Sequence, residues 1–287
     1  MKAKRIIIAS AGIAAIVLAI LLYRFLPGIL REKTPYGGDL LTVTFLDVGQ
    51  AEAILIGTPG GEFIMVDAGN QDDIGLVNDE LWLAGAKHLA LCAATHPHED
   101  HIGAMTELLY SPGADKLVLP DYDCDTYFVE KMLEAAEQEH IPVVFPETGE
   151  VIYDKDGVVI TVVYNGAGAE DANNASLMLR LTYDEVSLLL TGDAEQAEEM
   201  RAIQAGAELR ADILDLGHHG ASDAAYEPFL DRVKMKYGVI SCGRNNEYGH
   251  PHDRTLFTMA RYGVKLYRTD EMGTLRFASD GKTWKLP

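Results

Sequence analysis

Cysteine and basic side chains are the two kinds of residue that this 287-residue sequence has in short supply. Three cysteines, Cys92, Cys124 and Cys242, are too few and too scattered for a disulfide framework or a cysteine-based zinc site. Lysine and arginine number 24 against 44 aspartate and glutamate residues, which gives a formal net charge of −20. A surface this acidic repels polyanions, and it argues against broad nonspecific nucleic-acid binding.

Low-complexity and disorder-promoting sequence is also scarce. Hydrophobic residues make up 48% of the chain, a fraction that is ordinary for a folded protein. The length corresponds to one large domain or two small ones, so a sizeable core is available. The acidity is unevenly spread, because residues 1–33 hold six basic residues and one acidic residue and the remainder therefore carries −25.

The N-terminal segment is typical of a membrane anchor. An almost uninterrupted apolar run extends from Ile6 to Tyr23, and three basic residues precede it. At a rise of ~1.5 Å per residue, such a run spans the ~30 Å hydrocarbon core of a bilayer. The basic residues favour a cytoplasmic N-terminus, so we expect a transmembrane anchor at residues 1–26, with the rest of the chain outside the cytoplasm at the cell membrane. Cleavage as a signal peptide, which gives a secreted protein, is the alternative.

Residues 27–39 are rich in proline and glycine, and we interpret them as a linker. The remaining segment, residues 40–287, is expected to form the folded domain. Because residues 27–287 contain no second apolar run of about 18 residues, we do not expect this part of the chain to form a multi-helix membrane channel.

Short strand and helix patterns alternate from Leu40 onward. Alternating apolar and polar residues predict a strand at 41–45, and Thr-Pro-Gly-Gly between two apolar runs predicts a hairpin. A strand-rich first half and a strand-rich middle, each followed by helices, predict an α/β fold of two sheets packed face to face with helices outside. Further strands are expected at 53–56, 63–66, 89–93, 117–119, 143–145, 151–153, 158–163, 177–181, 186–190, 213–216, 239–242 and 264–267, and helices at 74–83, 126–138, 194–205, 226–233 and 255–262.

Seven of the nine histidines fall into three tight groups. The strongest group is Thr95-His-Pro-His-Glu-Asp-His101, which follows a predicted buried strand. Two imidazoles two residues apart in such a turn can bind one metal ion together, and Asp100 and His101 then face a second. Imidazole and carboxylate suit zinc, manganese or iron. The second group is His218 and His219, the third is His250 and His252, and His88 and His140 are isolated.

The histidine motif carries a resemblance to a known family. His-Pro-His-Glu-Asp-His is similar to the signature of the metallo-β-lactamase-fold hydrolases, and residues 40–280 resemble the extracellular hydrolase domain of ComEC-type DNA-uptake proteins and their stand-alone relatives. The resemblance implies an αββα sandwich of two mixed sheets with helices outside, as a hydrolase domain over residues 40–287. The segments that carry it are Phe45-Leu-Asp-Val-Gly-Gln50, Val66-Asp-Ala-Gly69, Asn173-Asn-Ala-Ser-Leu177, Leu190-Thr-Gly-Asp193, Gly217-His-His-Gly220, Tyr248-Gly-His-Pro-His252 and Arg268-Thr-Asp270.

The resemblance also implies a site with two divalent metal ions, zinc or manganese. His96 and His98 bind one ion, Asp100 and His101 the other, and Asp193 bridges the two. His218 is our first choice for the histidine that completes the second site, and His219 is the next. Asp67 supports the metal-binding loop. The residues expected to take part in catalysis are Asp100, Asp193, His219 and His250, and those expected behind the ligands or facing the substrate are Asp67, Asn174 and Ser176.

Two positions depart from the family pattern. Most dinuclear members have a third histidine between the first cluster and the bridging aspartate, whereas this chain has Asn173 and Asn174 at about that place. An amide oxygen is a weaker ligand than imidazole, so we expect weaker metal binding at the first site or a preference for a harder ion such as manganese. The second departure is Gly49-Gln-Ala-Glu52, where the ComEC pattern has Gly-Gln-Gly-Asp; Glu52 keeps the carboxylate.

Several polar loop residues are weaker candidates for the substrate cleft. For Ser176, Asn245, Tyr248 and Arg268, ordinary loop hydrogen bonding is at least as good an interpretation as a functional role, and His250 stands above them. The acidic stretch Glu195–Glu199 is expected to be a solvated helix face.

The metal pattern predicts a hydrolase. Two adjacent divalent ions can share a hydroxide and stabilise a phosphoryl displacement, so we expect a phosphodiesterase or nuclease acting through a metal-bridging hydroxide. Its substrate would be single-stranded DNA or a small phosphodiester, and a separate channel protein would be its partner in DNA uptake. Two alternatives stay open: a hydrolase of a small extracellular ester, such as a phosphocholine diester or a lactone, and a non-catalytic surface-binding module with a degraded metal site.

Overall fold

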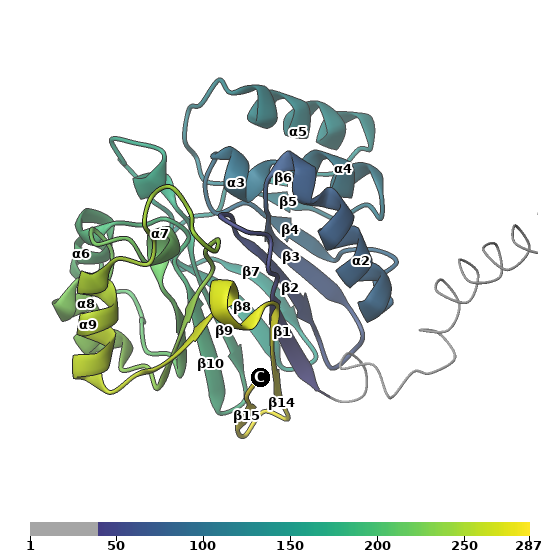
Figure 1. Cartoon of the computed structure of the whole chain (residues 1–287). Coiled ribbons are helices and arrows are strands. Elements are labelled where there is room, and N and C mark those ends of the chain that lie inside the picture. Colours follow the sequence, from purple (N-terminus) through teal and green to yellow (C-terminus); the bar gives the residue numbers. More distant parts are fainter. Residues whose placement is uncertain (1–39) are drawn as a thin grey trace, which may run out of the picture. The chain divides into compact units, whose positions relative to one another are not determined.

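The structure of this chain is a computed structural model that describes residues 40–287 (Figure 1). The expected anchor at residues 1–26 and the expected linker at residues 27–39 lie outside these residues. Within residues 40–287, none of the helices combines the length and the apolar character that a membrane span requires.

The first sheet has eight strands in the order β15-β14-β1-β2-β3-β4-β5-β6. It is mixed, because β14, β1, β2 and β3 pair in antiparallel fashion, whereas β3, β4, β5 and β6 run parallel. Its strands are β1 (Leu41–Phe45), β2 (Ala53–Gly57), β3 (Phe63–Ala68), β4 (Leu91–Ala93), β5 (Leu117–Val118), β6 (Val143–Val144), β14 (Leu275–Ser279) and β15 (Trp284–Lys285).

The second sheet has seven strands in the order β13-β12-β11-β10-β9-β8-β7. It is also mixed: β7 to β10 form an antiparallel meander, and β10 to β13 run parallel. Its strands are β7 (Val151–Lys155), β8 (Val158–Tyr164), β9 (Met178–Tyr183), β10 (Val186–Leu190), β11 (Ile213–Asp215), β12 (Tyr237–Ile240) and β13 (Lys265–Arg268).

The helices cover the outer faces of the two sheets. Figure 1 shows α2, α4 and α5 beside the first sheet and α6, α8 and α9 beside the second. The helices are α2 (Ile74–Ala84), α3 (Glu99–Ile102), α4 (Met105–Tyr110), α5 (Tyr127–Gln138), α6 (Gln196–Gln204), α7 (Gly217–Gly220), α8 (Glu227–Val233), α9 (Asp253–Tyr262) and α10 (Thr269–Met272), with single 3₁₀ turns η1 (Gln71–Asp73) and η2 (Asn173–Ala175).

Strand alternation explains why the two sheets pack face to face. In β2, Ile54 and Ile56 belong to the apolar cluster between the sheets, whereas Leu55 belongs to the cluster under the helices. In β3, Ile64 lies in the inner cluster and Met65 in the outer one. Because successive side chains of a strand point to opposite faces, a strand buried on both sides is apolar throughout. The predicted fold of two mixed sheets with helices outside is thus confirmed.

The C-terminal strands were not anticipated. No element was expected beyond Tyr267, yet β14 pairs with β1 in the first sheet, with Leu41 opposite Ser279. The chain therefore returns from the second sheet to the first. This pairing joins segments more than 200 residues apart, and no local sequence pattern specifies it.

The expectation for the acidic stretch Glu195–Glu199 was wrong for two of its residues. Glu198 and Glu199 are buried. The Glu199 carboxylate accepts the backbone N–H groups of Ala225 and Tyr226, at 3.0 and 2.6 Å. The buried Glu199 carboxyl group therefore holds the backbone that leads into α8, and Glu198 pairs with Arg201 at 2.7 Å.

Candidate metal centre

The three histidine groups meet where the strands of both sheets end. His96 and His98 follow β4, Asp193 follows β10, and His219 lies in α7 after β11. A pocket of about 550 Å³ opens at this edge. Its lining residues are Gln50, Asn70, His98, Glu99, Asp100, Asn173, Asp193, His218, His219, Glu247, Tyr248 and His250.

A first group consists of His96, His98 and Asp193, whose ligand atoms all lie within 4.8 Å of one another. The His96 Nε2 and His98 Nδ1 atoms are 3.1 Å apart, and His96 Nε2 lies 3.7 Å from Asp193 Oδ2. The structure thus brings together the three residues that the sequence suggested for the first ion.

A second group consists of Asp100, His101 and His219. His219 Nε2 lies 3.2 Å from Asp100 Oδ2, and His101 Nε2 lies 3.2 Å from Asp193 Oδ1. Asp193 belongs to the first group and also contacts the second, with Oδ1 3.2 Å from His101 Nε2 and Oδ2 3.8 Å from His219 Nε2. This is the placement that a bridging carboxylate needs.

Polar groups behind the histidines fix their orientation. The Asp67 carboxylate lies 2.8 Å from His101 Nδ1 and accepts hydrogen bonds from the backbone and hydroxyl of Thr95. His219 Nδ1 lies 2.9 Å from the carbonyl oxygen of Ser241. Because a carbonyl only accepts, Nδ1 of His219 carries the proton, and in the neutral ring Nε2 keeps its lone pair toward the pocket. Asp67 thus lies behind the loop that carries the histidines, where we expected it to support that loop.

A cluster of buried carboxylates lies behind Asp67 and His101, further from the pocket. Glu52 accepts a hydrogen bond of 2.8 Å from the Ser241 hydroxyl, and its carboxylate lies within 4.8 Å of ligand atoms of Asp67 and His101. Burial raises the pKa of Glu52 to about 6 and, together with the adjacent Glu52, raises that of Asp215. Neither Asp215 nor Ser241 was among the candidate site residues, since both lie outside the histidine motifs.

The site is electrostatically polarised. Burial by itself would raise the pKa of Asp193, but the imidazoles of His101, His219 and His96 hold it well below its usual value. Burial opposes the charged form of Asp100 too, yet His219 and His101 lower its pKa to about 2. Both carboxylates are therefore ionised at neutral pH.

The two adjacent histidines of α7 are not equivalent. Both have left-handed backbone angles, with φ of 51° for His218 and 54° for His219. His219 is buried beside Asp100, whereas His218 is part-exposed, with Nδ1 at 3.2 Å from Asp223 and Nε2 at 4.0 Å from Asp193. The geometry thus brings His219, our second choice, into the group with Asp100 and His101, and leaves His218 beside it.

The two asparagines also differ. Asn173 lines the pocket, and its Nδ2 lies 3.5 Å from His218 Nε2 and donates to Glu195. Asn174 does not line it; its side chain bonds to Asp171 and Glu195 instead. Asn173 therefore faces the pocket, whereas Asn174, which we expected behind the ligands or facing the substrate, lies away from it. Glu195 had been assigned only to a solvated helix face.

The remaining candidates lie at different depths. The Ser176 hydroxyl accepts the backbone N–H of Asp193 at 3.0 Å, so it positions that carboxylate. The His250 ring stands 5.6 Å from that of His218 and stacks at 6.3 Å on that of His219. Burial, followed by repulsion from His218 and His219, lowers the pKa of His250 to about 4, so it is neutral at pH 7. Arg268 pairs with Asp270 and does not line the pocket.

The donor set fits divalent metal ions. His101 Nε2 and Asp193 Oδ1 are buried, face each other and make no hydrogen bond within residues 40–287. Such atoms are costly to bury unless a partner satisfies them, and a cation held between them would do so. Imidazole nitrogens with carboxylate oxygens suit zinc, manganese or iron.

Sequence comparison agrees with the geometry. The profile of the metallo-beta-lactamase superfamily matches residues 46–244. ComE operon protein 3 of Bacillus subtilis is 29% identical over 252 residues, which cover 82% of this chain and 32% of that protein. Competence protein ComA of Neisseria gonorrhoeae is also 29% identical, with the same two shares covered. The chain thus spans about a third of the length of these curated relatives.

Solved structures share the fold at low sequence identity. The metallo-beta-lactamase fold protein YhfI from Bacillus subtilis superposes with a TM-score of 0.57 at 12% identity, covering 83% of this chain and 100% of that one. Igni18, a metallo hydrolase from the archaeon Ignicoccus hospitalis, gives a TM-score of 0.54 at 17% identity over 82% of this chain and 98% of its own.

Proposed function

We propose that this chain, which belongs to the metallo-beta-lactamase superfamily, is a metal-dependent hydrolase of phosphodiesters. The observation that carries the proposal is the position of buried Asp193, which belongs to one group of ligand atoms with His96 and His98 and also contacts His101 of the second group. When bound, divalent ions supply Lewis-acid stabilisation of phosphoryl oxygens and lower the pKa of water.

The chain's own residues supply positions and charge. His96, His98 and Asp193 would hold one ion, and Asp100 and His101, with Asp193 shared, the other. His219 completes the second set in our proposal because it lies 3.2 Å from Asp100. Asp67 and the Ser241 carbonyl hold the rings of His101 and His219, so the ligands are oriented before any ion arrives.

The substrate side is formed by Asn173, His218, Tyr248 and His250. His250 is neutral at pH 7, so it offers a hydrogen bond rather than a positive charge to the substrate. It lies 3.4 Å from Gln50, which limits rotation of its ring. We propose that His250 positions a phosphoryl oxygen, which is the catalytic place that the sequence suggested.

Two phosphodiester classes compete as substrate. The relatives named for competence favour DNA, whereas the pocket walls favour a small diester: Glu99 and Glu247 line the pocket, and none of the lining residues is lysine or arginine. Phosphate backbones are held largely by cationic side chains, so a long polyanion gains little from these walls. We therefore propose a small phosphodiester, or the end of a single strand, as the substrate.

The direct test is hydrolysis with manganese or zinc present, on single-stranded DNA and on bis-p-nitrophenyl phosphate. The double substitution Asp100→Ala with His101→Ala should abolish turnover, because it removes a carboxylate and an imidazole from the second group. His88→Ala, at an isolated histidine that does not line the pocket, is the matched control. Unchanged hydrolysis in the double variant would contradict the assignment.

Metal content distinguishes the hydrolase from a non-catalytic binding module with a degraded site. A hydrolase should hold stoichiometric manganese or zinc after loading, whereas a degraded site should hold less than one equivalent. If the protein hydrolyses a carboxylic ester or lactone but no phosphodiester, its activity is ester hydrolysis instead.

We also propose that the hydrolase domain lies outside the cytoplasm, anchored by the apolar run Ile6–Tyr23. The support is the sequence: the run has bilayer length and is preceded by basic residues. For DNA uptake we propose a separate channel protein as the partner of this domain. Protease added to intact cells should degrade the domain; full protection would contradict this placement.

A further inference from the structure

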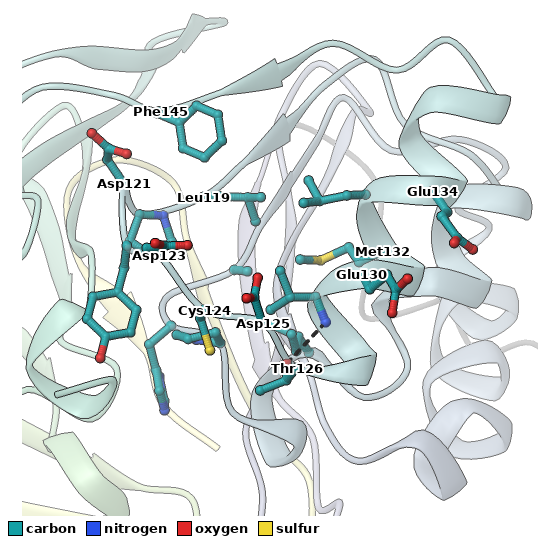
Figure 2. Close-up of a pocket in the computed structure, with 18 of the residues that line it drawn as sticks. Leu119, Asp121, Asp123, Cys124, Asp125, Thr126, Glu130, Met132, Glu134 and Phe145 are labelled. Carbon is teal, nitrogen blue, oxygen red and sulfur yellow. Dashed lines mark hydrogen bonds between the residues drawn. The ribbon is translucent and has the colours of Figure 1, made fainter.

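A second hollow, of about 900 Å³, lies next to the metal pocket (Figure 2). Its floor is apolar and comes from strand ends and from α5, with Leu119, Val129 and Met132 among its residues. His96 and Pro97 line it as well, so one wall backs onto the first metal group. We call this hollow the α5 groove.

The rim of the α5 groove is acidic. The loop before α5 contributes Asp121, Asp123 and Asp125, and α5 contributes Glu130, Glu134 and Glu137. Figure 2 shows Asp121 and Asp123 on the loop side of Leu119, with Glu130 and Glu134 on the helix side. None of the groove's lining residues is lysine or arginine.

Nearby cations compensate only the helix side of this rim. Lys131 pairs with Glu134 at 2.5 Å and also attracts Glu130. None of the ion pairs found among residues 40–287 involves the three loop aspartates. The loop side therefore keeps its negative potential and repels anionic ligands.

Aromatic side chains complete the walls. Phe145, 51% exposed, and Tyr122 both line the groove. An aromatic face attracts a cation through its quadrupole, and substituted ammonium groups are bound by aromatic rings combined with carboxylates. An apolar floor at the same place suits the carbon body of such a cation better than it suits a hydrated metal ion.

We propose that the α5 groove binds an organic ammonium cation carried on an apolar body. Charge complementarity selects the cation, and the apolar floor with Phe145 and Tyr122 selects its carbon surface. The volume lies in the range of small-molecule pockets, which favours a small cation over a basic peptide laid across the surface. The proposal requires no turnover at the metal pocket, so it stands independently of the hydrolase function.

The probe is benzyltrimethylammonium, compared with neutral benzyl alcohol and anionic benzoate by calorimetry at low salt. We expect saturable binding of the cation and at least tenfold weaker binding of the other two. Cys124 lines the groove, whereas Cys92 and Cys242 are buried and serve as internal references. Bound cation should slow the alkylation of Cys124 by iodoacetamide, read by mass spectrometry.

Matched variants locate the charge contribution. Asp121→Asn with Asp125→Asn should weaken cation binding by about tenfold, because each substitution removes one negative charge from the loop side of the rim. Asp79→Asn with Asp154→Asn removes two exposed acids that do not line the groove, and binding should stay within twofold.

A second pair of variants isolates the aromatic wall. Phe145→Ala should weaken cation binding severalfold, in line with a partly exposed cation–π contact. Phe257→Ala removes a phenylalanine that is 66% exposed on α9 and does not line the groove, and it should leave binding unchanged.

Four results would overturn the proposal. They are the absence of saturable binding, equal affinity for benzyl alcohol, unchanged affinity in the Asp121–Asp125 double variant, and no protection of Cys124. Protection of Cys124 by an alternating lysine–leucine peptide but not by the small cation would also overturn it, and would assign the groove to a protein partner.

Discussion

The two walls of the metal pocket are built differently. The wall formed by His96, His98, Asp100 and His101 is held from behind: His96 and His101 are fully buried, and Asp67 and Thr95 fix the loop, while His98 is exposed and Asp100 part-exposed toward the pocket. We call it the ligand wall. The opposite wall, formed by Asn173, His218, Tyr248 and His250, is open, and Tyr248 is 62% exposed. We call it the substrate wall.

The difference separates two tasks. Buried ligands with fixed partners behind them bind ions without reorganisation, and this keeps the geometry constant during catalysis. Part-exposed side chains can adapt to substrates and exchange them. Asp193 and His219 lie between the walls and contact the ligand wall, so substitutions should become milder from these residues toward the substrate wall.

The largest effect is expected at Asp193. Asp193→Asn removes the carboxylate charge that contacts both ligand groups while keeping the size of the side chain. Turnover of bis-p-nitrophenyl phosphate should fall by about a thousandfold, comparable to losing a central electrostatic contact in other enzymes. Metal content should fall as well. Full metal content with normal turnover in this variant would show that neither ligand group needs the Asp193 carboxylate.

The two histidines of α7 test where the ligand wall ends. The His219 side chain is 4% exposed and that of His218 is 23% exposed. We expect His219→Ala to weaken binding of the second ion by roughly a hundredfold, and His218→Ala by less than about tenfold. Titration with a metal indicator dye measures both. The reverse ranking would make His218 the ligand.

Asp67 tests whether the support behind the ligand wall matters. Asp67→Asn keeps an acceptor oxygen but removes the charge that faces His101 Nδ1. Metal affinity should fall by about 10- to 100-fold, the usual effect of removing a partner behind a ligating histidine. Asp223→Asn removes the corresponding partner of His218 on the substrate wall and should cost less. Equal losses of metal affinity in the two variants would contradict the difference between the ligand wall and the substrate wall.

Asn173 lies at about the position where most dinuclear members have a third histidine. A substitution there tests what that imidazole adds to metal binding. Asn173→His places an imidazole on the substrate wall, where it can add a stronger ligand than an amide. We expect zinc affinity to rise severalfold relative to manganese, measured by competition between the two ions. An unchanged zinc-to-manganese ratio would show that residue 173 does not reach the first ion.

Glu199 gives the smallest and most indirect test, since it supports the backbone that leads into α8. Burial raises its pKa to about 8, although the N–H groups of Tyr226 and Ala225 oppose this shift. From about pH 4.5 to pH 8 the folded chain therefore holds this proton more tightly than the unfolded chain does, and the unfolding free energy falls as pH rises.

The Glu199→Gln variant has no titratable carboxyl group at this position. Its unfolding free energy should therefore fall less as the pH rises. Urea unfolding at pH 5 and pH 8 measures the difference between the two slopes. Exposed Glu208→Gln should behave like the unsubstituted chain. A Glu199→Gln slope parallel to the unsubstituted one would show that Glu199 does not hold the proton.

Local pattern predicted the elements of the fold but not all of its pairings. The hairpin of β2 and β3 follows from two apolar runs around Thr-Pro-Gly-Gly, and helix α5 follows from its apolar spacing and the Thr126 cap, whose hydroxyl accepts the Val129 N–H. Strand β14 was missed because its position beside β1 depends on contacts across the whole chain.

At the site, the sequence predicted which residue types take part better than it predicted where each side chain points. The His96–His101 motif has a spacing that brings its side chains together, and the structure does so. His218 and His219 are neighbours with similar left-handed backbones, so only the path of α7 decides which ring faces Asp100. The buried acids Asp215 and Glu199 were missed because composition does not distinguish a buried carboxylate from a solvated one.

The central claim is that one carboxylate joins two metal sites. The most direct test is calorimetric titration of the metal-free chain with manganese, alongside Asp193→Asn and His88→Ala. We predict two equivalents for the unsubstituted chain and for His88→Ala, and fewer than two for Asp193→Asn. Less than one equivalent in the unsubstituted chain, or two equivalents retained after Asp193→Asn, would contradict the account.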